Sequence, residues 1–196
     1  MALWGNSDSD ESKPKWLTTA QKKEVFANTS GWVVEGGSAM TGNDNTNAAP
    51  EILVAIGNLT TGIGAADVTE VEWITTAADK SAGFTLSVRV RYNEAVTVTG
   101  SPTIAVTNGN EGSGSGRGPH TLVYASGTGT NELVFSLAIA AGNAATNADD
   151  VLTVAAQNIA KPGGATMKDT ADGTTDSAVA VSAAAVASTG SITVVA

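Results

Sequence analysis

The stretch FTLSVRVRY, residues 84–92, alternates apolar and polar side chains without a break. Its apolar members occupy every second position from Phe84 to Val90, and Arg89 and Arg91 are among the polar side chains between them. Because successive side chains of a β-strand point to opposite faces, this pattern predicts a strand with one face in a core. The other face, including both arginines, is expected to be in water.

A second stretch, HTLVYASGTGTNELVFSLAIAAG at residues 120–142, repeats the alternation on both sides of a turn. The Gly-, Ser- and Thr-rich residues 126–131 separate the two runs, which predicts a β-hairpin. Further short strands are expected within 95–100, 102–109, 151–155 and 178–183. Many short strands separated by turns indicate a mainly β fold, with a β-sandwich over residues 80–183. The expected core is Phe84, Leu86, Val88, Ile104, Leu122, Tyr124, Leu133, Phe135, Leu137, Leu152 and Val154.

Residues 1–77 are expected to form a smaller β-rich domain. A short helix is predicted over Gln21–Ala27, with Thr18 or Thr19 as its cap. EILVAIGNL, residues 51–59, is an apolar run of strand length and predicts a buried strand. VTEVEWITT, residues 68–76, alternates, with its tryptophan and its glutamates on opposite faces.

The C-terminal SITVV, residues 191–195, predicts one more strand, and a terminal strand needs a sheet edge to join. We expect residues 188–196 to return to the N-terminal domain and complete it, with the sandwich inserted between. A strand swapped onto a neighbouring subunit is the alternative.

Composition excludes several classes of function. The 196 residues include 19 acidic and 10 basic side chains, a net charge of -9, so nucleic acid is not an expected partner. The chain has no cysteine, which excludes disulfides, thiol catalysis and thiolate metal sites. No apolar segment is long enough to span a membrane, and the first residues do not resemble a signal peptide. Synthesis in a cytoplasm and no membrane partner are therefore expected.

Few residues offer catalytic chemistry. His120 is the only histidine, and no G-x-S-x-G motif accompanies it. The segment GSGSGRG, residues 112–118, lacks the Gly-Lys-Ser/Thr ending of a phosphate-binding loop. We interpret Arg117 and His120 as exposed loop or strand-edge residues. We predict no catalytic residue, no cofactor and no enzymatic activity.

Several aspartates stand in turn-rich segments. Asp149, Asp150 and the DTADGTTD run at residues 169–176 offer oxygen ligands, but their spacing does not match an EF-hand loop. Because Asp and Gly are common turn residues, we expect solvated turn carboxylates, with a calcium site as the alternative. A carboxylate pair for glycoside hydrolysis has little support, because only 5% of residues are aromatic.

All four tryptophans precede residue 78. Trp32 and Trp73 are expected in the core. Leu3, Trp4 and Trp16 are the candidates for anchoring the chain to another subunit, since aromatic side chains are enriched at interface hot spots.

Two resemblances extend this interpretation. FTLSVRVRYNEAVTVTGSPTIAVTNG, the hairpin at 120–142 and GATMKDTADG at 164–173 resemble, in this order, bacterial Ig-like repeat domains of surface and adhesin-like proteins. MALWGNSDSDESKPKWL at 1–17, with EILVAIGNL later, resembles short structural proteins of large T4-like marine phages.

The resemblances imply a virion structural protein, a capsid decoration or cement protein that binds the assembled head and projects an Ig-like domain. The implied partners are the major capsid protein or other virion proteins, and further copies of the chain as a homo-oligomer. The implied location is the capsid surface, after synthesis in the host cytoplasm. The alternative is a tail, neck or fibre-associated adhesin module, with a host-surface glycan as a weak ligand.

Overall fold

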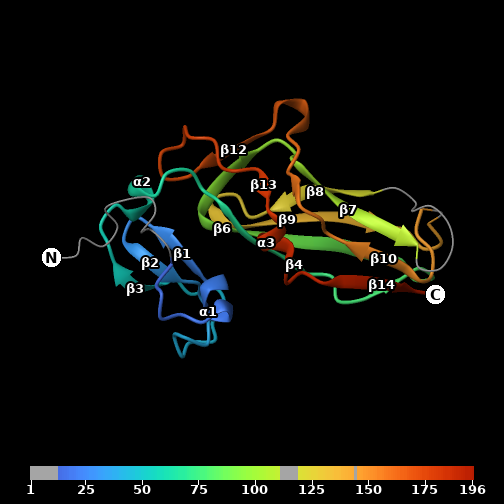
Figure 1. Cartoon of the computed structure of the whole chain (residues 1–196), viewed down its shortest axis with the longest axis horizontal. Helices are drawn as coiled ribbons and strands as arrows, with labels where there is room; N and C mark the ends of the chain where they lie inside the picture. The colour runs from blue at the N-terminus through green and yellow to red at the C-terminus, as the bar shows by residue number, and fades with distance from the viewer. Residues whose placement is uncertain (1–12, 111–118, 144) are drawn as a thin grey trace.

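The computed structural model describes residues 13–110, 119–143 and 145–196. Leu3, Trp4 and Arg117 lie outside the described residues. The fold is mainly β, as predicted, and two separate hydrophobic clusters divide it. We call residues 13–63, around the smaller cluster, the N-terminal unit, and the rest of the described chain the large unit (Figure 1).

The N-terminal unit is a three-stranded antiparallel sheet with two short helices. Its elements are α1 (Thr19–Lys23), β1 (Val25–Asn28), β2 (Gly31–Val34), β3 (Glu51–Ala55) and α2 (Leu59–Gly62). Thr18 caps α1 through a reciprocal pair of contacts with Gln21, so the predicted helix start is confirmed. The helix ends four residues earlier than predicted because Val25 and Phe26, which favour strands, pair with β2.

β3 is an edge strand and not the buried strand that its composition predicted. Among the described residues it has a strand, β2, on one side only. Leu53 and Val54 pack against the small core, while Ile52 is 55% exposed. The core of this unit is too small to cover both faces of an apolar strand.

The large unit contains the remaining elements. They are β4 (Val68–Trp73), β5 (Ala78–Asp79), β6 (Phe84–Thr99), β7 (Thr103–Asn110), β8 (His120–Ser126), β9 (Thr130–Ile139), β10 (Asp150–Thr153), β11 (Gln157–Asn158), a 3-10 turn (Pro162–Gly164), β12 (Thr166–Asp169), β13 (Ala180–Val181), α3 (Ala183–Val186) and β14 (Ser191–Val195). The long β6 pairs with β4 on one side and β9 on the other, and the order continues through β8, β7 and β10. Beyond a register shift between Arg91 and Val96, β12 replaces β4 as the neighbour of β6.

The alternation of residues 84–92 and of the hairpin is confirmed. β8 and β9 pair across the predicted turn, and their apolar faces meet that of β6 in one core. Every residue expected in this core is buried there or packs against it.

β14 joins the large unit, which corrects the prediction that it completes the N-terminal domain. It lies between β10, to which it is antiparallel, and β5, to which it is parallel, and so pairs within its own chain (Figure 1). The alternating Ile192 and Val194 are buried in the main core. β4, from the segment expected in the N-terminal domain, also pairs within the large unit.

The two units meet at one end of the large sheet. β1 runs parallel to β6 where Ala27 lies opposite Glu94, so the two sheets are continuous at this point. None of the helices in the described part of the chain is long and apolar enough to cross a bilayer.

Candidate functional site

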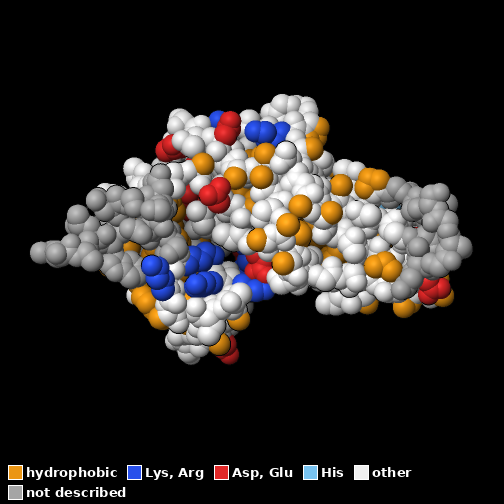
Figure 2. Space-filling view, viewed as in Figure 1, with side chains coloured by type: hydrophobic (Ala, Val, Ile, Leu, Met, Phe, Trp, Pro, Cys, Tyr) orange, Lys and Arg blue, Asp and Glu red, His pale blue; other side chains and the backbone are white. Residues whose placement is uncertain are grey.

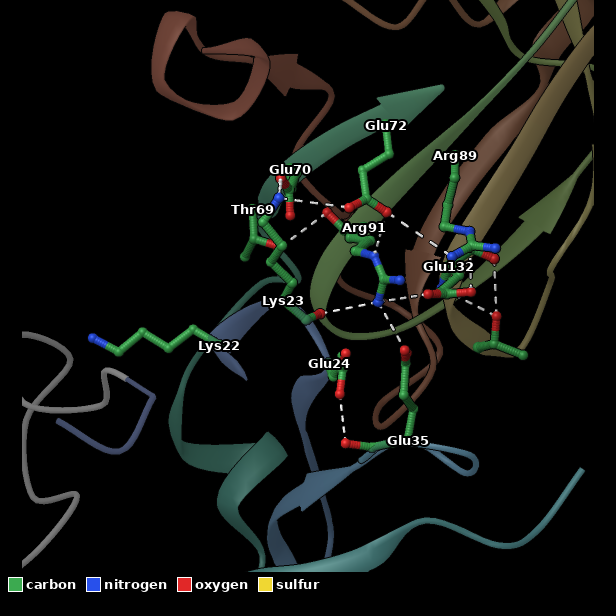
Figure 3. Close-up of polar contacts among 12 residues, drawn as sticks. Lys22, Lys23, Glu24, Glu35, Thr69, Glu70, Glu72, Arg89, Arg91 and Glu132 are labelled. Carbon is green, nitrogen blue, oxygen red and sulfur yellow. Dashed lines mark hydrogen bonds and ion pairs between the residues drawn. The ribbon is translucent and has the colours of Figure 1, made fainter. Parts of the chain in front are cut away.

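A network of ion pairs joins the two units where the N-terminal unit covers the polar face of β4 and β6 (Figure 3). We call it the charged junction. It consists of Lys23, Glu35, Glu70, Glu72, Arg89, Arg91 and Glu132. These side chains come from the end of α1, the residue after β2, and strands β4, β6 and β9.

Arg91 is the centre of the junction, with a side chain only 6% exposed. Its Nη1 lies 2.9 Å from Glu35 Oε2 and 2.7 Å from Glu132 Oε1, and its Nε lies 3.1 Å from Glu72 Oε2. Nη1 also donates to the backbone carbonyl of Lys23, at 3.0 Å. Burial alone would lower the pKa of Arg91, but Glu132 and Glu35 outweigh it and raise the pKa.

The burial of Arg91 corrects the prediction that the polar face of residues 84–92 is in water. The alternation of this strand is as predicted, but the N-terminal unit covers the polar face at Arg91, while Thr85 on the same face is exposed. Arg89, two residues earlier, is 34% exposed and lies farther from its partners, at 3.4 Å from Glu132 and 3.9 Å from Glu72. Period-two alternation separates two faces but does not show what covers the polar one.

Lys23 connects the N-terminal unit to β4. It forms an ion pair with Glu70 and lies 3.6 Å from Glu72, and the bond to Glu70 raises the pKa of Lys23. Burial opposes ionisation of Glu72, but Arg91 and Lys23 outweigh it, and the pKa of Glu72 is lowered. Burial raises the pKa of Glu132 against the effect of Arg91. Each charged side chain of the junction has an opposite charge within it, so the junction attaches the two units to each other.

A hollow of about 530 Å³ adjoins the junction. Lys13, Lys22 and Lys23 line it together with Glu70 and Asp67. Lys and Arg side chains gather near the boundary of the two units in Figure 2, although the chain carries a net charge of -9. Burial, followed by the charge of Arg91, lowers the pKa of Lys13 to about 8, and its Nζ donates to the carbonyl of Lys22 at 2.6 Å.

His120 is not an exposed residue, which corrects the prediction. It is 7% exposed, its Nε2 lies 3.1 Å from Thr146 Oγ1, and burial lowers its pKa. The residue opens β8 opposite Val106 of β7, and the segment before β10 supplies Thr146 from another side. The preceding Gly-Pro indicated a loop, but the strand pairing places the ring inside.

The aspartates divide into two groups. Asp172 is exposed and accepts bonds from the backbone of Thr174 and Thr175, at 2.7 and 2.8 Å, as the turn prediction requires. Asp149 and Asp176 are exposed too, whereas Asp150 and Asp169 are buried, which corrects the expectation of solvated carboxylates. In the described part of the chain, no cluster of three or more His, Cys, Asp or Glu is arranged to hold a metal ion.

The tryptophans within the described chain occupy the expected environments. Trp32 is 2% exposed, and Trp73 packs against the main core with its Nε1 3.4 Å from the carbonyl of Gly190. Trp16 is 62% exposed on the N-terminal unit.

Comparison with known proteins gave no relative for this chain. No protein-family model matches it, and neither do any curated protein or solved structure. The resemblances to Ig-like repeats and to phage structural proteins therefore depend on the sequence motifs alone.

Proposed function

We propose that this chain is a virion structural protein that binds the assembled phage head through its N-terminal unit and projects the large, Ig-like unit outward. The observation that carries the proposal is the edge of β3, which no strand of the described residues covers, on a unit that ion pairs join to a larger β module. The sequence resemblance to phage structural proteins supplies the identity of the assembly, and the geometry supports a binding role.

β3 offers a surface that another chain can extend. A strand with a neighbour on one side presents a row of backbone N–H and C=O groups, to which a strand of a partner can pair. Ile52, 55% exposed on β3, adds apolar surface, and the exposed Trp16 lies on the same unit. Burial of such side chains at a junction between shell subunits stabilises the assembled state, because the protein binds that state only.

The charged junction supports the second part of the proposal. A module that projects from a shell needs a fixed attachment to the part that binds. The guanidinium of Arg91 holds acids from both units and a carbonyl of the N-terminal unit at 2.7 to 3.1 Å. It donates hydrogen bonds to Glu35 and Glu72 and forms an ion pair with Glu132, so its contacts link both units.

Co-sedimentation with phage heads tests the proposal. Heads purified from particles whose gene for this chain is deleted are mixed with the full chain and centrifuged. We expect the wild type to saturate the heads, and Ile52→Lys to weaken binding at least tenfold, because the substitution places a charge in the interface. Val123→Lys is the matched control, because Val123 is an exposed apolar side chain of the large unit.

Each result has a definite meaning. Normal binding of Val123→Lys together with weak binding of Ile52→Lys supports attachment through β3. Absence of wild-type binding to heads contradicts the proposal. Equal loss for both variants would place the attachment elsewhere and contradict the role of β3.

A further inference from the structure

Glu94 is a fully buried carboxylic acid at the point where the two units meet. It is 0% exposed, and neither of its carboxylate oxygens receives a hydrogen bond from a donor in the described chain. It lies in β6 directly opposite Ala27, where β1 runs beside β6. The backbone that connects the two sheets therefore carries this side chain.

The charges that act most strongly on Glu94 are negative. Asp169 of β12, which is 2% exposed, has the largest effect of these acids on the pKa of Glu94. Asp67, which precedes β4, and Asp172 of the loop after β12 have smaller effects. β1 brings the uncharged Ala27 to this side. Asp169 is held in place because its Oδ1 accepts a bond from the backbone of Ala171 at 2.7 Å.

Two neighbouring buried carboxyl groups cannot both ionise without a large cost, so one of them keeps its proton. Burial, with Asp169 beside it, raises the pKa of Glu94 to about 8, and burial also raises the pKa of Asp169. A protonated Glu94 donates its O–H to the Asp169 carboxylate. This hydrogen bond gives the otherwise unpartnered Glu94 carboxyl group a partner. The pair then holds one negative charge instead of two.

We propose that the proton shared by Glu94 and Asp169 keeps β1 closed against β6, and that its release in mildly alkaline solution opens this contact. On release the proton passes to solvent, and two carboxylates remain side by side in a buried site. The charged junction keeps its ion pairs at this pH, because Arg91 and Lys23 both titrate above their usual range. The N-terminal unit therefore stays attached through the junction while β1 moves away from β6.

This device does not depend on the proposed function. It describes a change in the angle between two units, which is measurable in the purified chain whatever that chain binds.

A distance measurement between the units tests the proposal. The chain has no cysteine, so Thr61→Cys in α2 and Thr121→Cys in β8, both exposed, provide unique spin-label sites. Double electron–electron resonance is recorded on the full chain from pH 6 to pH 9.5. We expect a single narrow distance at pH 6 and a shifted or broadened distribution at pH 9.5, with a midpoint near the pKa of Glu94, about 8.

Two variants and a control identify the group responsible. Glu94→Gln keeps the shape and can donate to Asp169 but has no proton to lose, so its distances should be equally narrow at both pH values. Asp169→Asn gives Glu94 a donor and removes the facing charge, so any opening should vanish or move by at least one pH unit. Glu51→Gln, an exposed acid of β3, should respond as the wild type does.

The distance distributions of the wild type and the variants decide whether the proposal holds. An unchanged wild-type distribution between pH 6 and pH 9.5 overturns the proposal. A pH response that persists unaltered in Glu94→Gln, or in Asp169→Asn should the first variant not fold, also overturns it. A response lost in these variants and kept in Glu51→Gln supports it.

Discussion

At the scale of single residues, Arg91 and Glu94 share one strand but stand in opposite electrostatic environments. Arg91 faces three glutamates, and its charge is compensated inside the protein. Glu94, three residues later, faces acids and lacks a donor. One short piece of β6 therefore contains both an arginine that binds acids of the two units and a buried acid that faces other acids of the large unit.

Arg91→Met is expected to destabilise the protein by about 2 to 3 kcal/mol, because it removes a buried guanidinium from three half-buried carboxylates and leaves Glu35 without this partner. Urea unfolding followed by tryptophan fluorescence measures the change. Arg89→Gln is the control on the same face: its side chain is 34% exposed, so a loss of about 1 kcal/mol or less is expected. Equal losses in the two variants would show that Arg91 has no special role.

Glu94 predicts a pH dependence whose sign follows from its ionisation. In the folded chain its pKa is raised to about 8, from an ordinary value of 4.5 in the unfolded chain. Between these values the unfolded state binds fewer protons, so stability falls as pH rises, by up to about 1.4 kcal/mol per pH unit. The contribution is absent below the lower value and constant above the higher one.

Urea unfolding at intervals from pH 5 to pH 9 checks this expectation. Glu94→Gln should have a flatter profile than the wild type and should be the more stable of the two at pH 9. Parallel profiles for the two proteins would contradict the assignment of the buried proton to Glu94.

At the scale of elements, sequence pattern predicted the strands and much of the core of the large unit. Alternation identified β6, β8 and β9 because each has one face in a large core. It did not predict the register that buries His120, because pairing between strands distant in sequence decides that register. It also placed β14 in the wrong sheet, because Ile192 and Val194 would fit either core by composition.

The turn between β8 and β9 makes a specific demand on glycine. Gly127 has a φ of +108°, and a Cβ there would collide with the carbonyl oxygen of Glu132. Gly129 has a φ of +79° with open space around it. Gly127→Ala is expected to cost about 2 to 4 kcal/mol and Gly129→Ala about 1 kcal/mol, measured by thermal or urea unfolding. The reverse order would show that the hairpin is paired differently.

The position of β14 predicts a difference between adjacent residues. Val194 is 0% exposed in the main core, and Val195 is 55% exposed. Val194→Ala should lower the free energy of unfolding by about 2 kcal/mol, and Val195→Ala by less than about 0.5 kcal/mol. Similar losses at both positions would contradict the pairing of β14 with β10 and β5.

At the scale of the whole molecule, the candidate site could be predicted only in part. The arginines of β6 and the glutamates of β4 stand out in the sequence as the polar face of alternating strands. Their meeting with Lys23 and Glu35 could not be foreseen, because it depends on how the N-terminal unit docks. That docking joins residues up to 97 positions apart, as between Glu35 and Glu132 on either side of Arg91.

The arrangement of the two units suits the proposed role. The N-terminal unit offers an edge of β3 that is unpaired among the described residues, and the charged junction attaches the large unit to it. A protein arranged in this way suits attachment at one end and presentation at the other. Decoration of a head requires many copies over its surface, whereas a tail, neck or fibre component needs few.

The most direct test is gold labelling of intact virions, viewed by electron microscopy, with an antibody raised against residues 80–182. The account predicts label spread over the whole head, at many sites per particle, and its loss from particles whose gene for this chain is deleted. Label confined to the tail, neck or fibre tips, or no label on particles, would contradict it.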